Sequence, residues 1–318
     1  MYQVSIIIND KLYFPVIQGG LVWNTERKST PGTIKLSILR DDSMKIEEGC
    51  PIALVEDNLG VFHGYVFSIK ETKDDLLEII AYDQLRYLKN RDTYVYTAWS
   101  TGDLLNRIAT DFRLKLGTVD DTGIKLKLVE VDTELFDMIN NSIADTADAT
   151  KNLYILYDDY GELCLRKSTD LILNIVVDTT SAEDHVFTRS IDESTYNSIK
   201  LAYANEKAGT REIFQVFDSN TIKKWGVLQY YEQIQNKNTA KDKVEKLLSM
   251  HNTPKRTLTI RNCFGDSRVR AGFSVLVPMY DTNGEQKFYP MMVESAKHTY
   301  EADAHFMDLK LTGGVINS

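Results

Sequence analysis

The chain has 318 residues and a net charge of −9 at pH 7, and 43% of its residues are hydrophobic while 26% are charged. This length predicts two or three domains, and the composition is ordinary for a globular protein with a large core. No apolar run approaches the roughly 20 residues of a membrane span, and the N-terminus lacks the basic start of a signal peptide. Because the chain is acidic as a whole, we also expect no specific binding of nucleic acid.

The first expected domain covers residues 1–90 and is built from strands. Short alternating segments are separated by polar turns, and residues 49–83 have the pattern of a three-stranded meander. Gly64 lies inside the middle strand of this meander, where glycine normally weakens pairing, so it indicates a bulge or a close backbone approach. Such a sheet has to pair or close its edge strands, which predicts a barrel or a sandwich.

The hydrophobic period then changes from two residues to 3.6. Ser100 and Asp103 have the spacing of a capping box at the start of a helix, and a second amphipathic helix is expected to open at Thr133. A strand lies between the two helices, and a hairpin over residues 154–166 follows them. Residues 91–184 are therefore expected to form a small α/β domain.

The β pattern returns over residues 185–318, which make up the third expected domain. It is interrupted by an insertion at residues 218–254, in which a segment starting at Trp225 and Gly226 leads to a helix over residues 239–251. One face of that helix is apolar and the other carries Lys, Asp and Glu, which is typical of a helix with one face in solvent.

Landmarks of the first β domain recur in the same order in the third. Gly49 corresponds to Gly272, and each follows a hydrophobic residue by three positions. A Val-x-Ser-x-Lys pattern begins at Val66 and again at Val293, and a turn containing Asn and Gly precedes both. An opening hairpin is expected in each copy, and in the second copy it covers residues 199–217. Alternation of this kind also arises by chance in antiparallel meanders, but the ordered landmarks favour a duplicated β domain.

The three cysteines are far apart in the sequence, and each lies in or beside an expected strand. A disulfide framework or a zinc site needs cysteines at paired spacing, so we expect buried free thiols at Cys50, Cys164 and Cys263.

None of the short motifs indicates an active site. Gly265, Asp266 and Ser267 resemble the nucleophile block of GDS-type esterases, but they come late, lead into a strand and lack a downstream Asp-x-x-His. A Gly-Asp turn is expected there. His298 and His305 are expected near each other across the last hairpin, as surface histidines without a third metal ligand. We expect no cofactor, although paired catalytic carboxylates stay open because their spacing is spatial.

Two groups of residues resemble a known family. In the first half they are Val-Phe-His-Gly-Tyr-Val at residues 61–66 and Ile-Ala-Tyr-Asp-x-Leu-x-Tyr-Leu at residues 80–88. In the second half they are the Trp-Gly-Val-Leu-Gln run from Trp225 and the Gly-Asp-x-x-Val-x-Ala-Gly run from Gly265 to Gly272. Over nearly its whole length the chain is similar to baseplate hub proteins of PBSX-like defective prophages, contractile phages and R-type bacteriocins.

The resemblance implies an α+β, mainly β fold with two tail-tube-like antiparallel β-barrel domains and an inserted small α/β domain. It also implies a structural hub that forms a homotrimer and joins the six-fold tail tube to the three-fold central spike. A duplicated β domain in a trimer meets this need for a three-to-six symmetry adaptor. The implied partners are the tail tube protein, the central spike protein and other baseplate components, among them a wedge or LysM-type adaptor and the tape measure protein.

The implied location is the baseplate of a virion or tail particle, assembled in the host cytoplasm, and the particle is either a phage or a headless bacteriocin. No enzyme is expected, and no extra lytic or wall-binding domain, because the chain ends soon after its last expected strand. The alternative is a tail-associated peptidoglycan hydrolase with acidic residues in a cleft of the middle domain. The residues expected to matter for assembly come from the shared turns and strands: Gly49, Phe62, Gly64, Trp225, Gly226, Gly265, Asp266 and Gly272.

Overall fold

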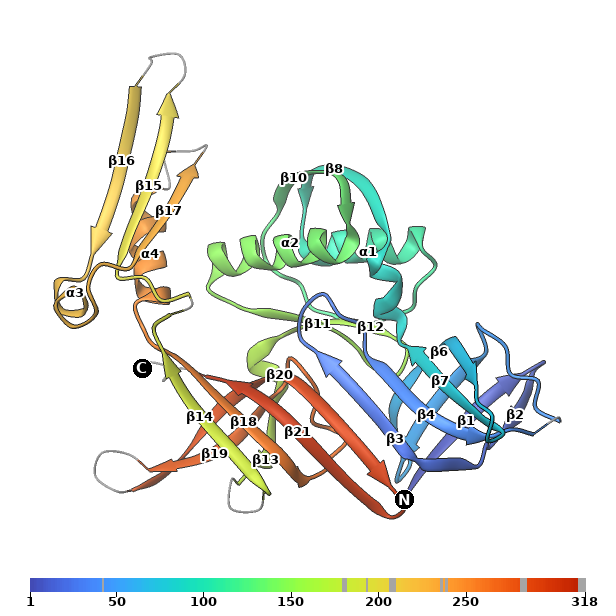
Figure 1. Ribbon diagram of the computed structural model, residues 1–318. Helices are drawn as coiled ribbons and strands as arrows, with labels where there is room; N and C mark the ends of the chain where they lie inside the picture. Colours follow the sequence, from blue (N-terminus) through green and yellow to red (C-terminus); the bar gives the residue numbers. More distant parts are fainter. Residues whose placement is uncertain are drawn as a thin grey trace. The chain divides into compact units, whose positions relative to one another are not determined.

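The computed structural model describes residues 1–41, 43–178, 182–192, 194–205, 210–234, 237, 240–280 and 285–313 (Figure 1). These residues form two compact units. The first combines Met1–His185 with Thr259–Leu311, and the second is built on Val186–Leu258. Strands dominate and helices are fewer, so the expected α+β, mainly β class is confirmed. The expected division into three domains stays a prediction.

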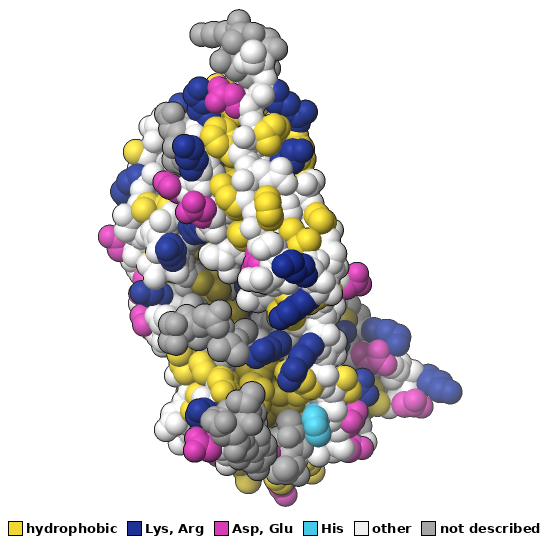
Figure 2. All heavy atoms as spheres, turned by 90° about the vertical axis from the view of Figure 1, so that its left-hand side faces the viewer, with side chains coloured by type: hydrophobic (Ala, Val, Ile, Leu, Met, Phe, Trp, Pro, Cys, Tyr) yellow, Lys and Arg dark blue, Asp and Glu magenta, His cyan; other side chains and the backbone are white. Residues whose placement is uncertain are grey.

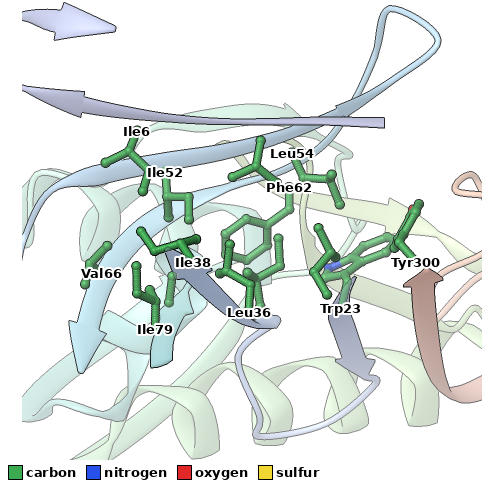
Figure 3. Close-up of a cluster of buried hydrophobic side chains, with 14 of the residues drawn as sticks. Ile6, Trp23, Leu36, Ile38, Ile52, Leu54, Phe62, Val66, Ile79 and Tyr300 are labelled. Atoms are coloured by element: carbon green, nitrogen blue, oxygen red, sulfur yellow. The ribbon is translucent and has the colours of Figure 1, made fainter. Parts of the chain in front are cut away.

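The N-terminal strands form one part of a large sheet, which we call the first copy. Their spatial order is β2-β1-β5-β6-β7-β4-β3, and neighbouring strands are antiparallel. Alternate residues enter one core (Figure 3); on β4, for example, Ile34, Leu36 and Ile38 are buried. The bounds are β1 (Tyr2–Ile8), β2 (Lys11–Tyr13), β3 (Ile17–Glu26), β4 (Thr33–Leu39), β5 (Pro51–Glu56), β6 (Leu59–Glu71) and β7 (Leu76–Tyr82).

The C-terminal strands form the other part of the sheet, the second copy, in the order β13-β19-β20-β21-β18-β14. The long strand β20 pairs with β19 and β21 and also with β3, so among the described residues thirteen strands form one continuous sheet. The bounds are β13 (Ile172–Val176), β14 (Asp184–Ser190), β18 (Lys255–Phe264), β19 (Ser274–Tyr280), β20 (Gln286–Glu301) and β21 (Ala304–Thr312).

The two copies share the backbone geometry that their sequence landmarks predict. Gly49 has φ of 89° and Gly272 has φ of 90°, a region that glycine adopts readily. The Gly49 N–H donates to the Val66 carbonyl at 2.7 Å, and the Gly272 N–H donates to the Val293 carbonyl at 2.8 Å. In both copies the valine N–H donates back to the residue that follows the glycine. The aligned landmarks therefore mark equivalent positions in the two copies.

Other parts of the repeat differ from the prediction. Residues 199–217 do contain a hairpin, but it belongs to a separate sheet. In the second copy, strand β13 pairs with β19, at the place where β1 pairs with β5 in the first copy. Unlike β1, β13 is parallel to its neighbour. Strand pairing in the described residues does not close either copy into a barrel, so the two barrels stay a prediction. The expected turns at residues 207–209 and 283–284 lie outside the described residues.

An α/β segment lies between the copies in sequence and has its own core. The capping box is confirmed, because the Ser100 side chain accepts from the Asp103 N–H and Asp103 accepts from the Ser100 N–H. The second helix begins at Leu135, two residues after the predicted Thr133. The bounds are η1 (Gln84–Lys89), β8 (Arg91–Trp99), α1 (Thr101–Asp111), β9 (Leu116–Val119), β10 (Leu126–Glu134), α2 (Leu135–Thr150), β11 (Tyr154–Asp158), β12 (Leu163–Lys167) and η2 (Ser168–Leu171).

The second unit contains a three-stranded sheet in the order β16-β15-β17, with helix α4 packed on one face. Trp225 ends helix α3, which Asp218 caps, and strand β17 follows before helix α4. Hydrophobic side chains lie among Lys and Arg on the face of this unit that Figure 2 shows, and Ile213, Phe217 and Tyr231 are exposed. The bounds are β15 (Ser198–Asn205), β16 (Thr210–Phe217), α3 (Ser219–Trp225), β17 (Gln229–Ile234) and α4 (Ala240–His251).

The three cysteines are free, as predicted; Cys164 and Cys263 are buried and Cys50 is half-buried. No helix in the described part of the chain is both long enough and apolar enough to cross a membrane.

Candidate functional site

Side chains from both copies of the sheet meet in a buried polar cluster near the pairing of β3 with β20. We call it the junction cluster, and its members are Trp23, Glu56, His298, Tyr300 and His305. Trp23 and His298 are direct cross-strand partners whose rings stack with centroids 4.6 Å apart. Tyr300 and His305 stack across the β20–β21 hairpin with centroids 4.0 Å apart. Period-two alternation brings His298 and Tyr300 to the same side of β20.

The polar atoms of His298, His305 and Glu56 form a chain. His298 Nε2 lies 2.8 Å from the Val269 carbonyl oxygen, and His298 Nδ1 lies 2.9 Å from His305 Nε2. His305 Nδ1 in turn lies 3.2 Å from Glu56 Oε2. Because His298 is fully buried and the other side chains are mostly buried, water does not compete for these contacts.

The donors in this chain follow from the chemistry of its ends. The Val269 carbonyl can only accept, so His298 carries its proton on Nε2 and its Nδ1 accepts from His305 Nε2–H. His305 Nδ1 then faces a carboxylate oxygen of Glu56, and two acceptors cannot bond without a proton between them. A hydrogen bond between His305 Nδ1 and Glu56 therefore forms only when a proton lies between these two atoms.

Burial sets the charges in the cluster. Burial lowers the pKa of His298 to about 3, with a smaller contribution from the neighbouring His305, so this ring is neutral near pH 7. Desolvation also lowers the pKa of His305, while the nearby Glu56 acts in the opposite direction. Burial raises the pKa of Tyr300, with a further contribution from Glu56. His298 is thus a neutral imidazole, while burial of His305 opposes a proton on this ring and Glu56 favours one.

A second buried polar group, the acid pair Asp83 and Asp158, joins the first copy to the α/β segment. Asp83 caps η1 by accepting from the Leu85 N–H at 3.1 Å, and it also accepts from the Gly32 N–H at 2.9 Å. Burial and the charge of Asp158 raise the pKa of Asp83 well above its usual range. Burial likewise raises the pKa of Asp158 to about 7.

Arg270 links the junction cluster to this acid pair. Its guanidinium lies 5.5 Å from the ring centroid of Trp23 and donates from Nη1 to the Asp158 carbonyl at 2.9 Å. The side chain is 8% exposed, so its charge acts in a poorly solvated region. One buried cation therefore contacts the first copy, the α/β segment and its own second copy.

Two of the predicted assembly residues lie together in the first core. Phe62 is buried, and a Cβ at Gly64 would lie 2.7 Å from Phe62 Cζ and would overlap the Tyr82 carbonyl oxygen. Gly64 pairs in register with Ile52, and the irregular steps lie on either side of it, between Leu54 and Val55 and beyond Val66. The close backbone approach is confirmed, and the bulges flank Gly64 instead of including it.

Gly265 and Asp266 lie beside the junction cluster. A Cβ at Gly265 would overlap the ring of His305, and the Gly265 N–H donates to the His305 carbonyl at 2.8 Å. Asp266 sits in a turn as predicted, where it accepts two hydrogen bonds from the Arg268 guanidinium at 2.9 and 2.6 Å. A Cβ at Gly272 would overlap Ile155 of the α/β segment.

The remaining predicted residues lie outside the cluster. The space around Gly49 is open, and so is the space around Gly226, which follows helix α3 with φ of 76°. Trp225 is half-buried in the second unit. The sequence indicated that His298 and His305 lie close together, which is confirmed, but His298 is fully buried and His305 is half-buried.

The junction cluster can hold a proton but offers no opening for a substrate, because His298 and Tyr300 are fully buried. In the part of the chain that the structure describes, no group of three or more His, Cys, Asp or Glu side chains could hold a metal ion. One cavity, of about 420 Å³, has the acidic residues Asp159 and Glu162 in its lining. It puts two carboxylates of the α/β segment beside an open space.

The family model described as YQBQ-like matches residues 21–312 of this chain. The phage-like element PBSX protein XkdQ of Bacillus subtilis (strain 168) is 24% identical over 314 residues, which cover 95% of this chain and 94% of the relative. The resemblance to proteins of PBSX-like elements is thereby confirmed.

Two solved structures share the fold. The 43 kDa tail protein of prophage MuSo2 from Shewanella oneidensis has a TM-score of 0.67 at 13% identity, over 97% of this chain and 98% of its own length. A tail protein from Neisseria meningitidis MC58 has a TM-score of 0.69 at 12% identity, over 99% of this chain and 97% of its own. The fold is therefore that of phage tail proteins.

Proposed function

Because this chain belongs to the YQBQ-like family, we propose that it is a structural protein of a phage-type tail, acting as the hub of the baseplate. The observation that carries the proposal is the duplication inside one chain, in which Gly49 and Gly272 hold the same backbone conformation at equivalent places. A hub needs repeated surfaces held rigidly, and the buried junction cluster fastens the two copies to each other.

In this proposal the chain forms a homotrimer. Three chains with two copies each supply six similar surfaces toward a six-fold tail tube, while the trimer itself matches a three-fold central spike. Each copy becomes a tail-tube-like barrel element when neighbouring chains cover its edge strands, which also prevents aggregation. The domain division that fits this assembly is 1–90, 91–184 and 185–318.

The proposed partners are the tail tube protein, the central spike protein and other baseplate components, among them a wedge or LysM-type adaptor and the tape measure protein. The protein acts in the virion or tail particle, after assembly in the host cytoplasm. It works without catalysis, because its buried polar groups are used for contacts between parts of the chain.

Native mass spectrometry across a concentration series tests the trimer. A trimer supports the six-surface ring, and a stable dimer contradicts it, since two chains cannot match a three-fold spike. Quantitative mass spectrometry of purified tails tests the location, with three copies of this chain expected for each tail. Purified tails that lack the chain would contradict the hub role.

A second candidate function is peptidoglycan hydrolysis, and the acidic cavity with Asp159 and Glu162 is the observation that favours it. We rank it lower because these residues form a tight turn, in which each backbone N–H donates to the carbonyl of the other. Zymography on purified cell walls decides between the two functions. A clearing zone that Asp159→Asn or Glu162→Gln abolishes would overturn the structural proposal.

A further inference from the structure

A cavity of about 480 Å³ lies at one end of the first copy, where β3, β4 and β7 meet η1. Three cations line it: Lys35 on β4, and Arg86 and Lys89 on η1. Glu26 is the acidic residue of this lining, and its carboxylate accepts a hydrogen bond from the Thr30 hydroxyl at 3.3 Å. We call this cavity the basic pocket, because its cations outnumber its carboxylate.

One cation of the basic pocket, Arg86, is held in place by aromatic rings. The Arg86 guanidinium lies 5.4 Å from the ring centroid of Phe67 and 6.0 Å from that of Tyr82, so aromatic rings from β6 and β7 position it. Within the described residues, none of the three cations forms an ion pair. In a chain with a net charge of −9, such a pocket is a local attractor for a carboxylate or another anion.

An acidic feature lies at the opposite end of strand β7 from the basic pocket. Asp74 and Asp75 form the exposed turn between β6 and β7, which we call the acidic turn. The Asp75 carbonyl accepts from the Arg40 N–H at 2.8 Å, which fixes the turn against the end of β4. The side chains of Arg40 and Lys70 at this end are paired with glutamates at 3.2 and 2.9 Å, so they do not neutralise the turn. Lys73, which precedes it, is the nearest cation in sequence.

We propose that the basic pocket of one copy of this chain takes the acidic turn of a second copy, an inference that rests on the proposed function. The pocket includes Tyr82 at the end of β7, and the turn immediately precedes Leu76 at its start. The two features are therefore separated by the length of one strand, about 20 Å, and cannot neutralise each other within one chain. A contact that joins opposite ends of the same element is head-to-tail, and repeated head-to-tail contacts close into a ring when the rotation between copies permits it.

A nucleic acid phosphate would satisfy the same cations, but the acidic chain as a whole repels a polyanion. A second copy brings both the matching carboxylates and a turn that is already ordered. Forming the contact therefore costs little conformational entropy in either copy.

Charge exchange tests the contact on the full chain. The pocket reversal Lys35→Glu with Lys89→Glu, or the turn reversal Asp74→Lys with Asp75→Asn, places like charges in every contact. Either is expected to weaken association by about tenfold or more in sedimentation or native mass spectrometry. Asn is chosen at position 75 because the residue there has φ of 56°, which Asn tolerates. The chain with both reversals restores opposite charges and is expected to recover the oligomer of the unmodified chain.

Lys11→Glu with Lys127→Glu is the matched control for the pocket reversal, because it changes the net charge by the same amount at exposed positions outside both features. It should leave the oligomer unchanged, and circular dichroism should show every variant folded. If pocket reversal leaves the oligomer intact, or double reversal does not recover it, the contact is wrong while the proposed trimer stands. A wild-type chain that stays monomeric at every concentration contradicts both. If pocket reversal abolishes binding of a short DNA duplex without changing the oligomer, the pocket serves phosphates and the proposal is overturned.

Discussion

His305 Nδ1 lies 3.2 Å from Glu56 Oε2, so the β20–β21 hairpin of the second copy is fastened to the end of β5 in the first copy. His305 also donates to His298, the direct cross-strand partner of Trp23 on β3. His305 therefore connects Glu56 of the first copy to the strand pairing that joins the two copies. We expect the relative position of the copies to depend on His305.

The first prediction concerns Glu56. Glu56→Ala leaves the buried His305 Nδ1 without its partner, and we expect the free energy of unfolding to fall by about 1–3 kcal/mol. Glu56→Gln is expected to cost less, because the Gln amide can donate to a neutral His305 Nδ1. Urea denaturation at pH 7 measures both. If Glu56→Ala and Glu56→Gln lower the free energy of unfolding equally, the Glu56 side chain does not stabilise the fold through a hydrogen bond to His305.

The second prediction is a pH dependence caused by His298. The folded pKa is about 3 against an ordinary value of 6.5, so the unfolded chain binds more protons between these values. Stability is therefore fully present above about pH 6.5 and falls as the pH drops toward 3, by at most about 1.4 kcal/mol per pH unit. His298→Gln removes this titration, so its unfolding free energy should decrease less between pH 6.5 and pH 5 than that of the unmodified chain. Parallel profiles would contradict a neutral, buried His298.

Most of the features of the fold that could be predicted from the sequence depend on short, local patterns. The capping box at Ser100 depends on residues three apart, and the glycine at 49 or 272 depends on one backbone conformation. Both features can be recognised in the sequence without knowing which residues pack against them. Helix α3 was missed because it has only seven residues and no buried face, although Asp218 before it and Gly226 after it are ordinary cap residues.

The strands and side chains that pair with each other across the fold could not be predicted in the same way. Alternation identified β15 and β16 as a hairpin but not that it pairs with β17 in its own sheet. The junction cluster brings Trp23 and Glu56 to the C-terminal hairpin, and these side chains lie in ordinary strand patterns far away in the sequence. The His298–His305 pair was the only local signal for the cluster. Its burial follows from the pairing of β20 with β3, which a single sequence does not encode in any short pattern.

The third prediction concerns Asp158. Its pKa rises from 3.8 to about 7 on folding, so between these values the folded chain binds more protons than the unfolded chain. Its contribution to stability is present at low pH and is lost as the pH rises from about 4 to 7, by at most about 1.4 kcal/mol per pH unit. Asp158→Asn should flatten this part of the stability profile.

Asp159→Asn is the control for that measurement, because the Asp159 side chain is 56% exposed beside the same turn. It should change the slope between pH 4 and pH 7 much less than Asp158→Asn does, because the charge of Asp159 is the smallest of the causes that set the pKa of Asp158. A slope that persists in Asp158→Asn would assign the titration to another group, and Asp83, whose pKa is also raised, is the first to substitute next.

The last prediction is that the first copy does not tolerate a side chain at position 64. A Cβ there would overlap the Tyr82 carbonyl and press on Phe62, both of which are fixed by the sheet and its core. Gly64→Ala is expected to cost about 3 kcal/mol or more, as overpacked cores do, and Gly64→Val should prevent assembly of complete tails. Gly123→Ala is the matched control: it has φ of 74° but open space around it, so only about 1 kcal/mol is expected. Urea denaturation and electron microscopy of particles measure the two effects. Complete tails from Gly64→Val would contradict a rigid first copy as the basis of assembly.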